Sequence, residues 1–235
     1  MDYLTKIYKD RCKEEFGTLG FKTYRKNFYR VVNDVFQSFD LQKSVSGGDC
    51  TIHFVVVPLC AGSSITKEYC GPDHIKMFAG DYSWFYYDRN DLRDIERCMD
   101  EMMVYMKKYM IPYFENANNS ENAYYATCKF QQNCYRRGLF LADPYLYYMA
   151  LRAGLYEQAI EHLTAWRKHT EEAYISNTQG RKDSPEIVKY KKRIIDKLNR
   201  LDYEIEMVSS RNMEYIQNFI AENEDIALLN LGIKK

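Results

Sequence analysis

The sequence predicts an α+β fold, in which a small antiparallel β-sheet (a meander) is covered by helices and followed by an all-α helical bundle region. Three observations support this fold class. A helical pattern at the N-terminus changes near Phe28 to β-branched and aromatic runs. A strongly amphipathic helix follows these runs, and beyond residue 117 nearly every segment has helical spacing. The 235 residues are therefore expected to form two domains, 1–116 and 117–235.

The first element is a helix over residues 2–16, where apolar side chains recur at helical spacing. Asn33 and Asp34 are typical of a tight hairpin turn. Three antiparallel strands are expected around this turn and the glycine-rich turn that follows it, at residues 28–32, 35–41 and 51–59. A further short strand is expected at 83–88, whereas residues 60–83 fit no single pattern.

A long helix closes the first half. Asn90 or Asp91 can cap its first turn, and Pro112 is expected to end or bend it. One face of this helix is apolar and rich in methionine, with Leu92, Ile95, Met99, Met102, Met106 and Met110. Since one sheet face must be covered, this helix and the N-terminal one are the expected cover.

The second half is expected to be helical throughout. Asp143 followed by Pro144 is a strong helix start signal, a capping residue before proline at the first helical position. Helices are expected at residues 121–137, 144–153, 155–172, 184–208 and 211–222, with an apolar tail after them. In the fourth of these, apolar positions step by four and three, which is typical of a helix packed along a neighbour. These features favour an antiparallel bundle.

Composition excludes several classes of protein. Lys plus Arg equals Asp plus Glu, at 33 each, which argues against a surface given over to nucleic acid or anionic lipid. No apolar run approaches the roughly 20 residues that span a bilayer. Seven cysteines occur without a Cys-x-x-Cys pair, and the N-terminus lacks a signal-peptide pattern. We therefore expect a cytoplasmic protein with no metal site and no cofactor.

Four segments of the first half resemble one bacterial family, domain of unknown function 4304. They are Leu19-Gly20-Phe21-Lys22, Lys26-Asn27-Phe28-Tyr29-Arg30, Leu41-Gln42-Lys43-Ser44 and Met110-Ile111-Pro112-Tyr113-Phe114. The resemblance covers roughly residues 1–116 and implies a small bacterial α+β domain. It brings no catalytic residues. Because some such domains occur in toxin–immunity settings, it implies a protein partner.

The leading functional hypothesis is a non-catalytic protein-interaction module, of the immunity type. No complete catalytic set is present, so no catalytic residue is predicted. The 22 tyrosines support the hypothesis, because tyrosine offers contact area with a polar tip. We expect another protein as the partner, with no membrane association, and the oligomeric state is left open.

Two alternatives remain open. A small-ligand-binding protein or enzyme would have its site in the groove between sheet and bundle, at Arg30, Gln42, Lys43, His53 and Trp84. Nucleic-acid binding would use the mixed basic and aromatic segment 21–30, with Arg25, Lys26 and Arg30 exposed on one face. Strand alternation places Phe28 and Tyr29 on opposite faces, so the segment is a poor stacking platform. Nucleic acid is therefore the less favoured partner.

Overall fold

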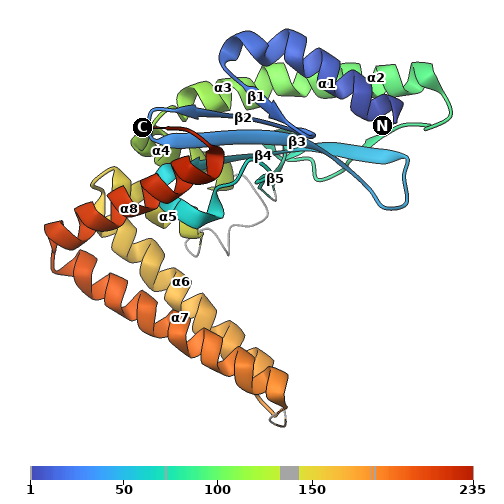
Figure 1. Cartoon of the computed structure of the whole chain (residues 1–235). Coiled ribbons are helices and arrows are strands. Elements are labelled where there is room, and N and C mark those ends of the chain that lie inside the picture. Colours follow the sequence, from blue (N-terminus) through green and yellow to red (C-terminus); the bar gives the residue numbers. More distant parts are fainter. Residues whose placement is uncertain (1, 72, 133–142, 181, 183, 235) are drawn as a thin grey trace.

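The computed structural model describes residues 2–71, 73–132, 143–180, 182 and 184–234. An antiparallel sheet lies at its centre (Figure 1). The strands follow the order β1-β2-β3-β4-β5, with β6 also paired to β4, so the predicted meander is confirmed. The strand bounds are β1 Lys22–Tyr24, β2 Asn27–Val32, β3 Val35–Lys43, β4 Asp49–Pro58, β5 Asp73–His74 and β6 Phe85–Tyr86.

The three predicted strands correspond to β2, β3 and β4. The turn between β2 and β3 has two residues, and Asn33 adopts a positive φ of 52° there, a conformation that asparagine tolerates well. The strand expected at 83–88 is shorter, limited to β6. Between β4 and β6 the chain forms the short helices η2 (Leu59–Ser64) and η3 (Ile75–Ala79) and the strand β5.

One face of the sheet is covered by α1 (Tyr3–Phe16), α2 (Leu92–Tyr105) and α3 (Ile111–Asn116), as predicted (Figure 1). The turn η1 (Gly17–Leu19) follows α1. The helical path does not end at Pro112, because a π-helical turn, η4 (Met106–Met110), joins α2 to α3. This wider turn lies directly before the proline, whose ring and missing N–H disrupt a regular α-helical ladder.

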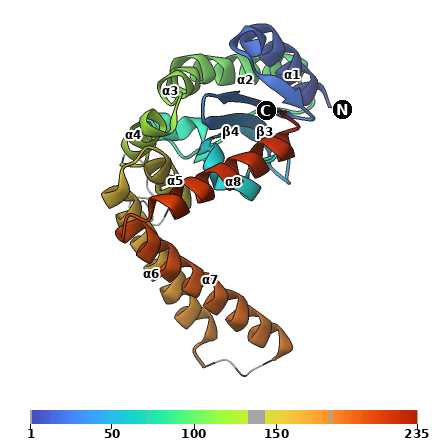
Figure 2. The same cartoon turned by 60° about the vertical axis from the view of Figure 1, so that its left-hand side comes forward.

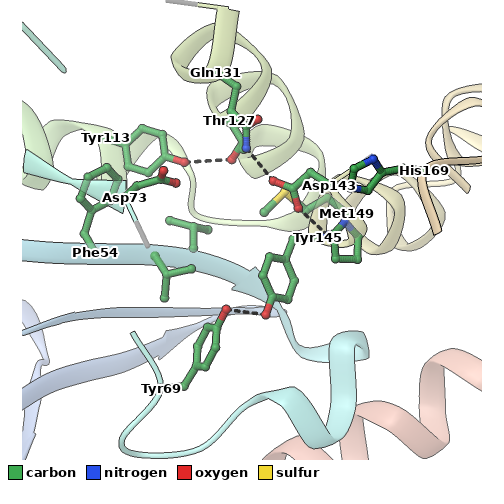
Figure 3. Close-up of a pocket in the computed structure, with 13 residues that line it drawn as sticks. Phe54, Tyr69, Asp73, Tyr113, Thr127, Gln131, Asp143, Tyr145, Met149 and His169 are labelled. Carbon is green, nitrogen blue, oxygen red and sulfur yellow. Dashed lines mark hydrogen bonds between the residues drawn. The ribbon is translucent and has the colours of Figure 1, made fainter. Parts of the chain in front are cut away.

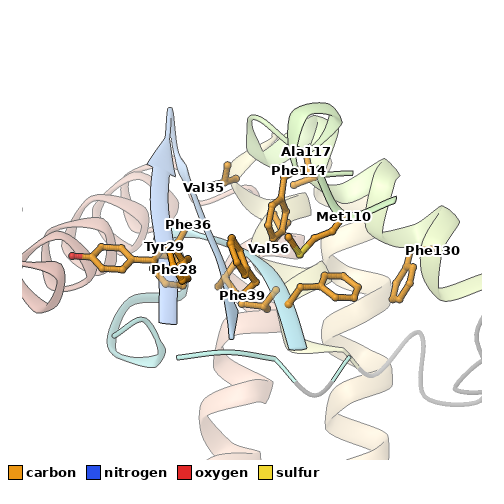
Figure 4. Close-up of a cluster of buried hydrophobic side chains, with 14 of the residues drawn as sticks. Phe28, Tyr29, Val35, Phe36, Phe39, Val56, Met110, Phe114, Ala117 and Phe130 are labelled. Carbon is orange, nitrogen blue, oxygen red and sulfur yellow. The ribbon is translucent and has the colours of Figure 1, made fainter. Parts of the chain in front are cut away.

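Aromatic and methionine side chains fill the space under these helices (Figure 4). Phe39 lies at the centre, stacked on Phe28 with ring centroids 5.1 Å apart and in edge contact with Phe16. The methionine face of α2 and η4 is buried in the same cluster, at Met99, Met102, Met103, Met106 and Met110. These methionines therefore serve the core.

The C-terminal region is all-helical, as predicted. Its helices are α4 Ser120–Gln132, α5 Pro144–Arg152, α6 Tyr156–Thr178, α7 Pro185–Ser209 and α8 Met213–Leu231. Two run further than expected: α6 continues past residue 172, and α8 continues past residue 222. Gly232, with a φ of 67°, ends α8, so Leu228 and Leu229, expected with Ile233 in the apolar tail, belong to the helix. Ile233 follows the helix and packs against the buried cluster. Of the helix expected at 121–137, residues 133–137 lie outside the described residues.

The C-terminal helices divide between two arrangements. α5 packs on β4 and η2, and α8 lies along η2, so both cover the sheet from the side opposite α1 and α2 (Figure 1). α6 and α7 form an antiparallel hairpin that projects away from the sheet (Figure 2). The buried cluster contains residues from both halves of the chain. The division into two domains stays a prediction. Within the described ranges, no helix combines the length and the apolar character needed to cross a bilayer.

Candidate functional site

Arg30, the first of the predicted ligand-binding residues, is used inside the fold. Its Nε donates to Gln37 Oε1 at 2.7 Å and its Nη1 to the carbonyl of Leu19 at 2.7 Å. The guanidinium lies 4.5 Å from the ring centroid of Phe21, and burial lowers its pKa. Arg30 therefore joins β2 and β3 to the turn after α1.

The other predicted ligand-binding residues do not converge on one site. Lys43 Nζ pairs with Asp2 Oδ2 at 2.7 Å beside the start of α1, and the carbonyl of Trp84 accepts from Lys76 Nζ at 3.3 Å. Gln42 and His53 lie nearer each other. Gln42 Oε1 accepts from Lys26 Nζ at 3.3 Å, and His53 sits opposite Asp40 in the β3–β4 register. Burial is the main cause that lowers the pKa of His53.

The basic and aromatic segment 21–30 is exposed at residues 22–26 and buried at Phe21 and residues 27–29. Arg25 pairs with Glu68, and Lys26 Nζ lies 2.6 Å from the buried Asp40 carboxylate. Three of the four rings are buried, Phe21, Phe28 and Tyr29. Arg25 and Lys26 keep exposed side chains, whereas Arg30 is bonded inside the fold, so the three cations do not all lie on one exposed face.

A cavity of about 350 Å³ opens between the sheet and the C-terminal helices. β4 supplies Phe54, Val55 and Val56 to its wall, α4 supplies Thr127 and Gln131, and the start of α5 supplies Asp143, Pro144, Tyr145 and Met149. The other described lining residues are Tyr69, Asp73, Tyr113 and His169. None of the five predicted ligand-binding residues is among them, although the cavity lies in the groove between sheet and helices where that alternative expected a site.

Polar groups surround this cavity in three hydrogen-bonded sets (Figure 3). Asp143 accepts from the Tyr145 backbone N–H at 2.9 Å and from Gln131 Nε2 at 2.6 Å. The hydroxyl groups of Tyr69 and Tyr145 bond each other, and those of Tyr113 and Thr127 lie 2.9 Å apart. The sets come from the loop before β5 and from α3, α4 and α5.

Burial sets the electrostatic character of the cavity. It raises the pKa of Asp143, because the carboxylate is desolvated and its hydrogen bonds only partly offset the cost. Burial also raises the pKa of Tyr69, Tyr145 and Tyr113, so these phenols remain protonated at neutral pH. The cavity thus combines neutral hydroxyl groups with carboxylates.

Sequence reasoning identified Asp143 only as a helix cap. Asp73 lies in the stretch that fitted no pattern, and Tyr113 lies beyond the expected end of its helix. Phe54 and His169 are far apart in the sequence, whereas periodicity relates only residues of one element. The pattern therefore could not indicate that these residues line one cavity. The one available signal was Asp143-Pro144, which marks where α5 begins beside β4.

The outer part of the α6–α7 hairpin is the second candidate site. We call residues 167–200 the distal hairpin. Thr170 is the one buried residue within its described part. The two helices are held together along their seam by a few contacts: Arg167 Nε to Asp202 Oδ1 at 2.7 Å, Lys197 Nζ 4.9 Å from the Trp166 ring centroid, and Asn177 Nδ2 to the Tyr190 hydroxyl at 3.4 Å. Neither helix is covered on its outer sides by the described residues.

The distal hairpin carries an excess of positive charge. It contains ten basic and five acidic residues, although the chain as a whole is neutral. Most of the basic residues lie on α7: Lys189, Lys191, Lys192, Arg193, Lys197 and Arg200. Among the described residues, no group of three or more His, Cys, Asp or Glu is placed to hold a metal ion. The distal hairpin is therefore a basic, exposed arm.

Comparison with known proteins assigns the N-terminal half. Residues 13–116 match the family model described as Domain of unknown function (DUF4304), and the match ends at the last residue of α3. Searches of curated proteins and of solved structures found no match. The resemblance seen in the sequence is confirmed: the N-terminal half of this chain carries a DUF4304 domain, over residues 13–116.

Proposed function

We propose that this protein is a non-catalytic protein-interaction module, and that the distal hairpin is the surface that it presents to its partner. The observation that carries the proposal is the exposure of both helices of the hairpin on their outer sides. A helix pair that buries little apolar surface gains little stability from packing. A partner that covers the hairpin would supply the packing that it lacks.

Three branched aliphatic side chains lie exposed on the distal hairpin. Ile175, Val188 and Ile195 have 52%, 53% and 45% of their surface accessible. Each directly follows a less exposed residue at the seam between the two helices, namely Tyr174, Ile187 and Ile194. In an antiparallel helix pair, positions one residue after the seam lie on the same side of both helices, because successive residues turn by about 100°. These three side chains therefore share one side of the hairpin, which we call the aliphatic patch.

Lysines lie beside the aliphatic patch. Lys191 and Lys192 are three and four residues from Val188 on α7, which places them next to it on the helix surface. The matching partner surface carries acidic side chains next to aliphatic ones. Two hairpins of this protein would bring net positive charge against net positive charge, so a second copy is a poor occupant.

The same residues favour a protein over a nucleic acid. Branched aliphatic side chains bury area against other side chains but offer no ring for base stacking. Within the distal hairpin Tyr190 lies under Arg193, and just outside it Trp166 lies under Lys197. The immunity role implied by the family resemblance is one form of this interaction. The many tyrosines do not carry the proposal, because several of them, such as Tyr8 and Tyr147, are fully buried in the core.

The test is a comparison of two valine variants in affinity capture. Val188→Asp places a negative charge in the aliphatic patch. Val104→Asp makes the same change on the outer side of α2, where the valine is 60% exposed. Tagged wild-type and variant proteins are incubated with the native cell extract at about 0.15 M salt, where surface charges still act over roughly 8 Å. Captured proteins are quantified by mass spectrometry, with and without nuclease.

We expect one protein to be recovered in near-equal amount by the wild type and by Val104→Asp, and at least about tenfold less by Val188→Asp. Nuclease should not change its recovery. Equal recovery by both variants, loss of capture after nuclease treatment, or no captured protein at all would contradict the proposal. Circular dichroism of both variants shows whether the helices are intact.

A further inference from the structure

Two cysteines from different elements meet in the core between the sheet and its helix layer. Cys50 lies near the start of β4 and Cys98 lies in the middle of α2. Their Sγ atoms are 3.7 Å apart, although 48 residues separate them in the sequence. Both residues are fully buried. The pair is a contact between α2 and the sheet and is not part of the distal hairpin.

Regular backbone structure holds both cysteines in place. Cys50 is the cross-strand partner of Lys43 on β3 and of Phe85 on β6, so β4 is paired on both sides at this point. Cys98 belongs to the buried face of α2, within the span of a regular helix. Because neither cysteine lies in a loop, the two sulfur atoms stay close to each other in the folded protein.

The separation of the sulfur atoms is short enough for a covalent bond to form after a small movement. A disulfide bond is about 2.0 Å long, so the two sulfurs must approach by roughly 1.7 Å from their contact distance of 3.7 Å. Each sulfur moves when its side chain rotates about the Cα–Cβ bond, so the two residues share this approach. Met102 Sδ lies 3.8 Å from Cys50 Sγ, and its flexible thioether can adapt to such a shift.

The hydrogen bond between the two thiols makes them unequal. It lowers the pKa of Cys98, and the positive charge of the neighbouring Arg97 acts in the same direction, against the effect of burial. The same hydrogen bond, together with burial, raises the pKa of Cys50. Since the thiolate is the reactive form of cysteine, Cys98 is the better nucleophile of the pair.

A cavity of about 250 Å³ lies next to the residues that hold the pair. Lys43, the cross-strand partner of Cys50, and Ile95, one turn before Cys98 on α2, are among the residues that line it. Hydrogen peroxide is little larger than a water molecule, which occupies about 30 Å³ in the liquid, so it fits in this space. The cavity therefore offers a small oxidant a place close to the thiols.

We propose that Cys50 and Cys98 are a peroxide-sensitive dithiol, which hydrogen peroxide converts into a disulfide between β4 and α2. In the first step the Cys98 thiolate attacks one peroxide oxygen, which breaks the O–O bond and gives a sulfenic acid and hydroxide. The Cys50 sulfur then attacks the Cys98 sulfur, and the S–O bond breaks as the S–S bond forms. The departing hydroxide takes up the thiol proton. Overall, two thiols and one peroxide give one disulfide and two water molecules, and the sulfurs supply the two electrons.

The disulfide would fasten α2 to the sheet. Because the bond closes a loop of 48 residues, it would restrict the unfolded chain and so stabilise the folded protein. We expect oxidation to raise the melting temperature by about 5 °C or more. A thiol reductant would reverse this change by thiol–disulfide exchange.

Mass spectrometry of the oxidised full-length protein tests the proposal. The protein is reduced, freed of reductant and treated with hydrogen peroxide, either folded or in urea, and the remaining thiols are then alkylated under denaturing conditions. Trypsin leaves Cys50 and Cys60 together in the peptide 44–67 and Cys98 in the peptide 98–107. We expect these two peptides to be linked at least about tenfold more abundantly when the folded protein is oxidised than when it is oxidised in urea.

A pair of cysteine variants assigns the link. Cys98→Ala removes one partner and should abolish both the link and the rise in melting temperature. Cys60→Ala is the matched control, because Cys60 is also fully buried but its Sγ donates to the carbonyl of Tyr148 at 3.4 Å. This control should keep the link and the rise in melting temperature, and with Cys60 absent the peptide 44–67 can be linked only through Cys50. Thermal unfolding without peroxide shows whether both variants fold.

Several results would overturn the proposal. They are the absence of the linked peptide from the oxidised wild type, equal amounts of it after oxidation in the folded state and in urea, and loss of the link in Cys60→Ala. A rise in melting temperature that persists in Cys98→Ala would also contradict it. If Cys98→Ala does not fold, Cys50→Ala removes the other partner and should give the same loss. None of these results bears on capture through the hairpin, which Val188→Asp tests separately.

Discussion

The sheet and the distal hairpin are built from equally regular elements, but they differ in how they are covered. β3 and β4 have helices on both faces, and every residue from Val35 to Leu41 is buried. α7 has 25 residues, of which Leu201, Glu204 and Val208 are buried, all near its C-terminal end. Regular backbone structure thus does not show how much tertiary support a segment receives. The difference predicts that the sheet region carries most of the stability, and it is the ground on which we propose the hairpin as the surface for a partner.

A pair of isoleucine variants measures this difference most strongly. Ile52→Ala removes a fully buried side chain from β4 and should lower the free energy of unfolding by about 2–5 kcal/mol. Ile195→Ala, at a half-exposed position on α7, should change it by less than about 0.5 kcal/mol, since alanine also favours helix. Urea denaturation of both variants gives the values. Similar losses in the two would remove the contrast between the regions.

A variant of Gln37 tests how β3 is bonded to the C-terminal end of α3. Its buried amide donates to the carbonyls of Phe114 at 2.6 Å and Ala117 at 2.9 Å, where α3 ends. Gln37→Leu would leave these carbonyls and the Arg30 guanidinium without that partner, so we expect a loss of about 1–3 kcal/mol in urea denaturation. A loss below about 0.5 kcal/mol would show that water replaces the amide and that the contact is not structural.

Gly62 tests how α8 joins the sheet. It has φ 62° and ψ −120°, a conformation almost restricted to glycine, and an added Cβ would meet the side chain of Asn223 on α8. We expect Gly62→Ala to cost about 1–3 kcal/mol. Gly17→Ala is the control, because Gly17 has an ordinary helical backbone with open space around it. An equal effect of both changes on the melting temperature would contradict this account of the α8 contact.

The pH dependence of Asp143→Asn gives the smallest effect. The folded-state pKa of Asp143 lies above its unfolded value, so its contribution to stability is present at low pH and is lost as pH rises through the folded pKa. At neutral pH the charge is a cost, which asparagine avoids while still capping α5. We expect the variant to be more stable than the wild type at pH 7 and to lose that advantage near pH 3.

Thermal unfolding at the two pH values makes the comparison. His162 and His169 on α6, Asp73 at the sheet edge and the tyrosines of the cavity also face this region, so the difference between wild type and variant is the relevant quantity. A variant that is less stable than the wild type at pH 7 would show that the charge of Asp143 stabilises the free protein.

Local sequence signals predicted most elements of this fold, and the places where they failed have physical causes. Asp91 and Asp143 cap helices as expected, and Asn33 turns the chain between β2 and β3. β1 was missed because Lys22–Tyr24 is exposed throughout and so shows no alternation. Of the two outcomes expected at Pro112, an end or a bend, the end does not occur, because the helical path continues through a π-helical turn directly before the proline.

The candidate sites depend on tertiary packing, which local signals do not describe. The cavity forms because α5 lies on β4, bringing Tyr145 to Tyr69 and Asp143 to Gln131. The seam of α7 was visible in its apolar spacing. That the outer side of the pair stays uncovered became evident only from the path of the hairpin away from the sheet (Figure 2).

Native-state hydrogen exchange of the full-length protein, followed by mass spectrometry, tests the contrast between the two regions most directly. Opening free energies rise with the buried surface and contacts that a segment has. We predict that backbone amides of α6 and α7 within residues 170–178 and 187–200 exchange at least about 100-fold faster than those of β3 and β4 under the same conditions. Equal protection in the distal hairpin and the sheet would contradict the account, because the hairpin would then already have the support that we assign to a partner.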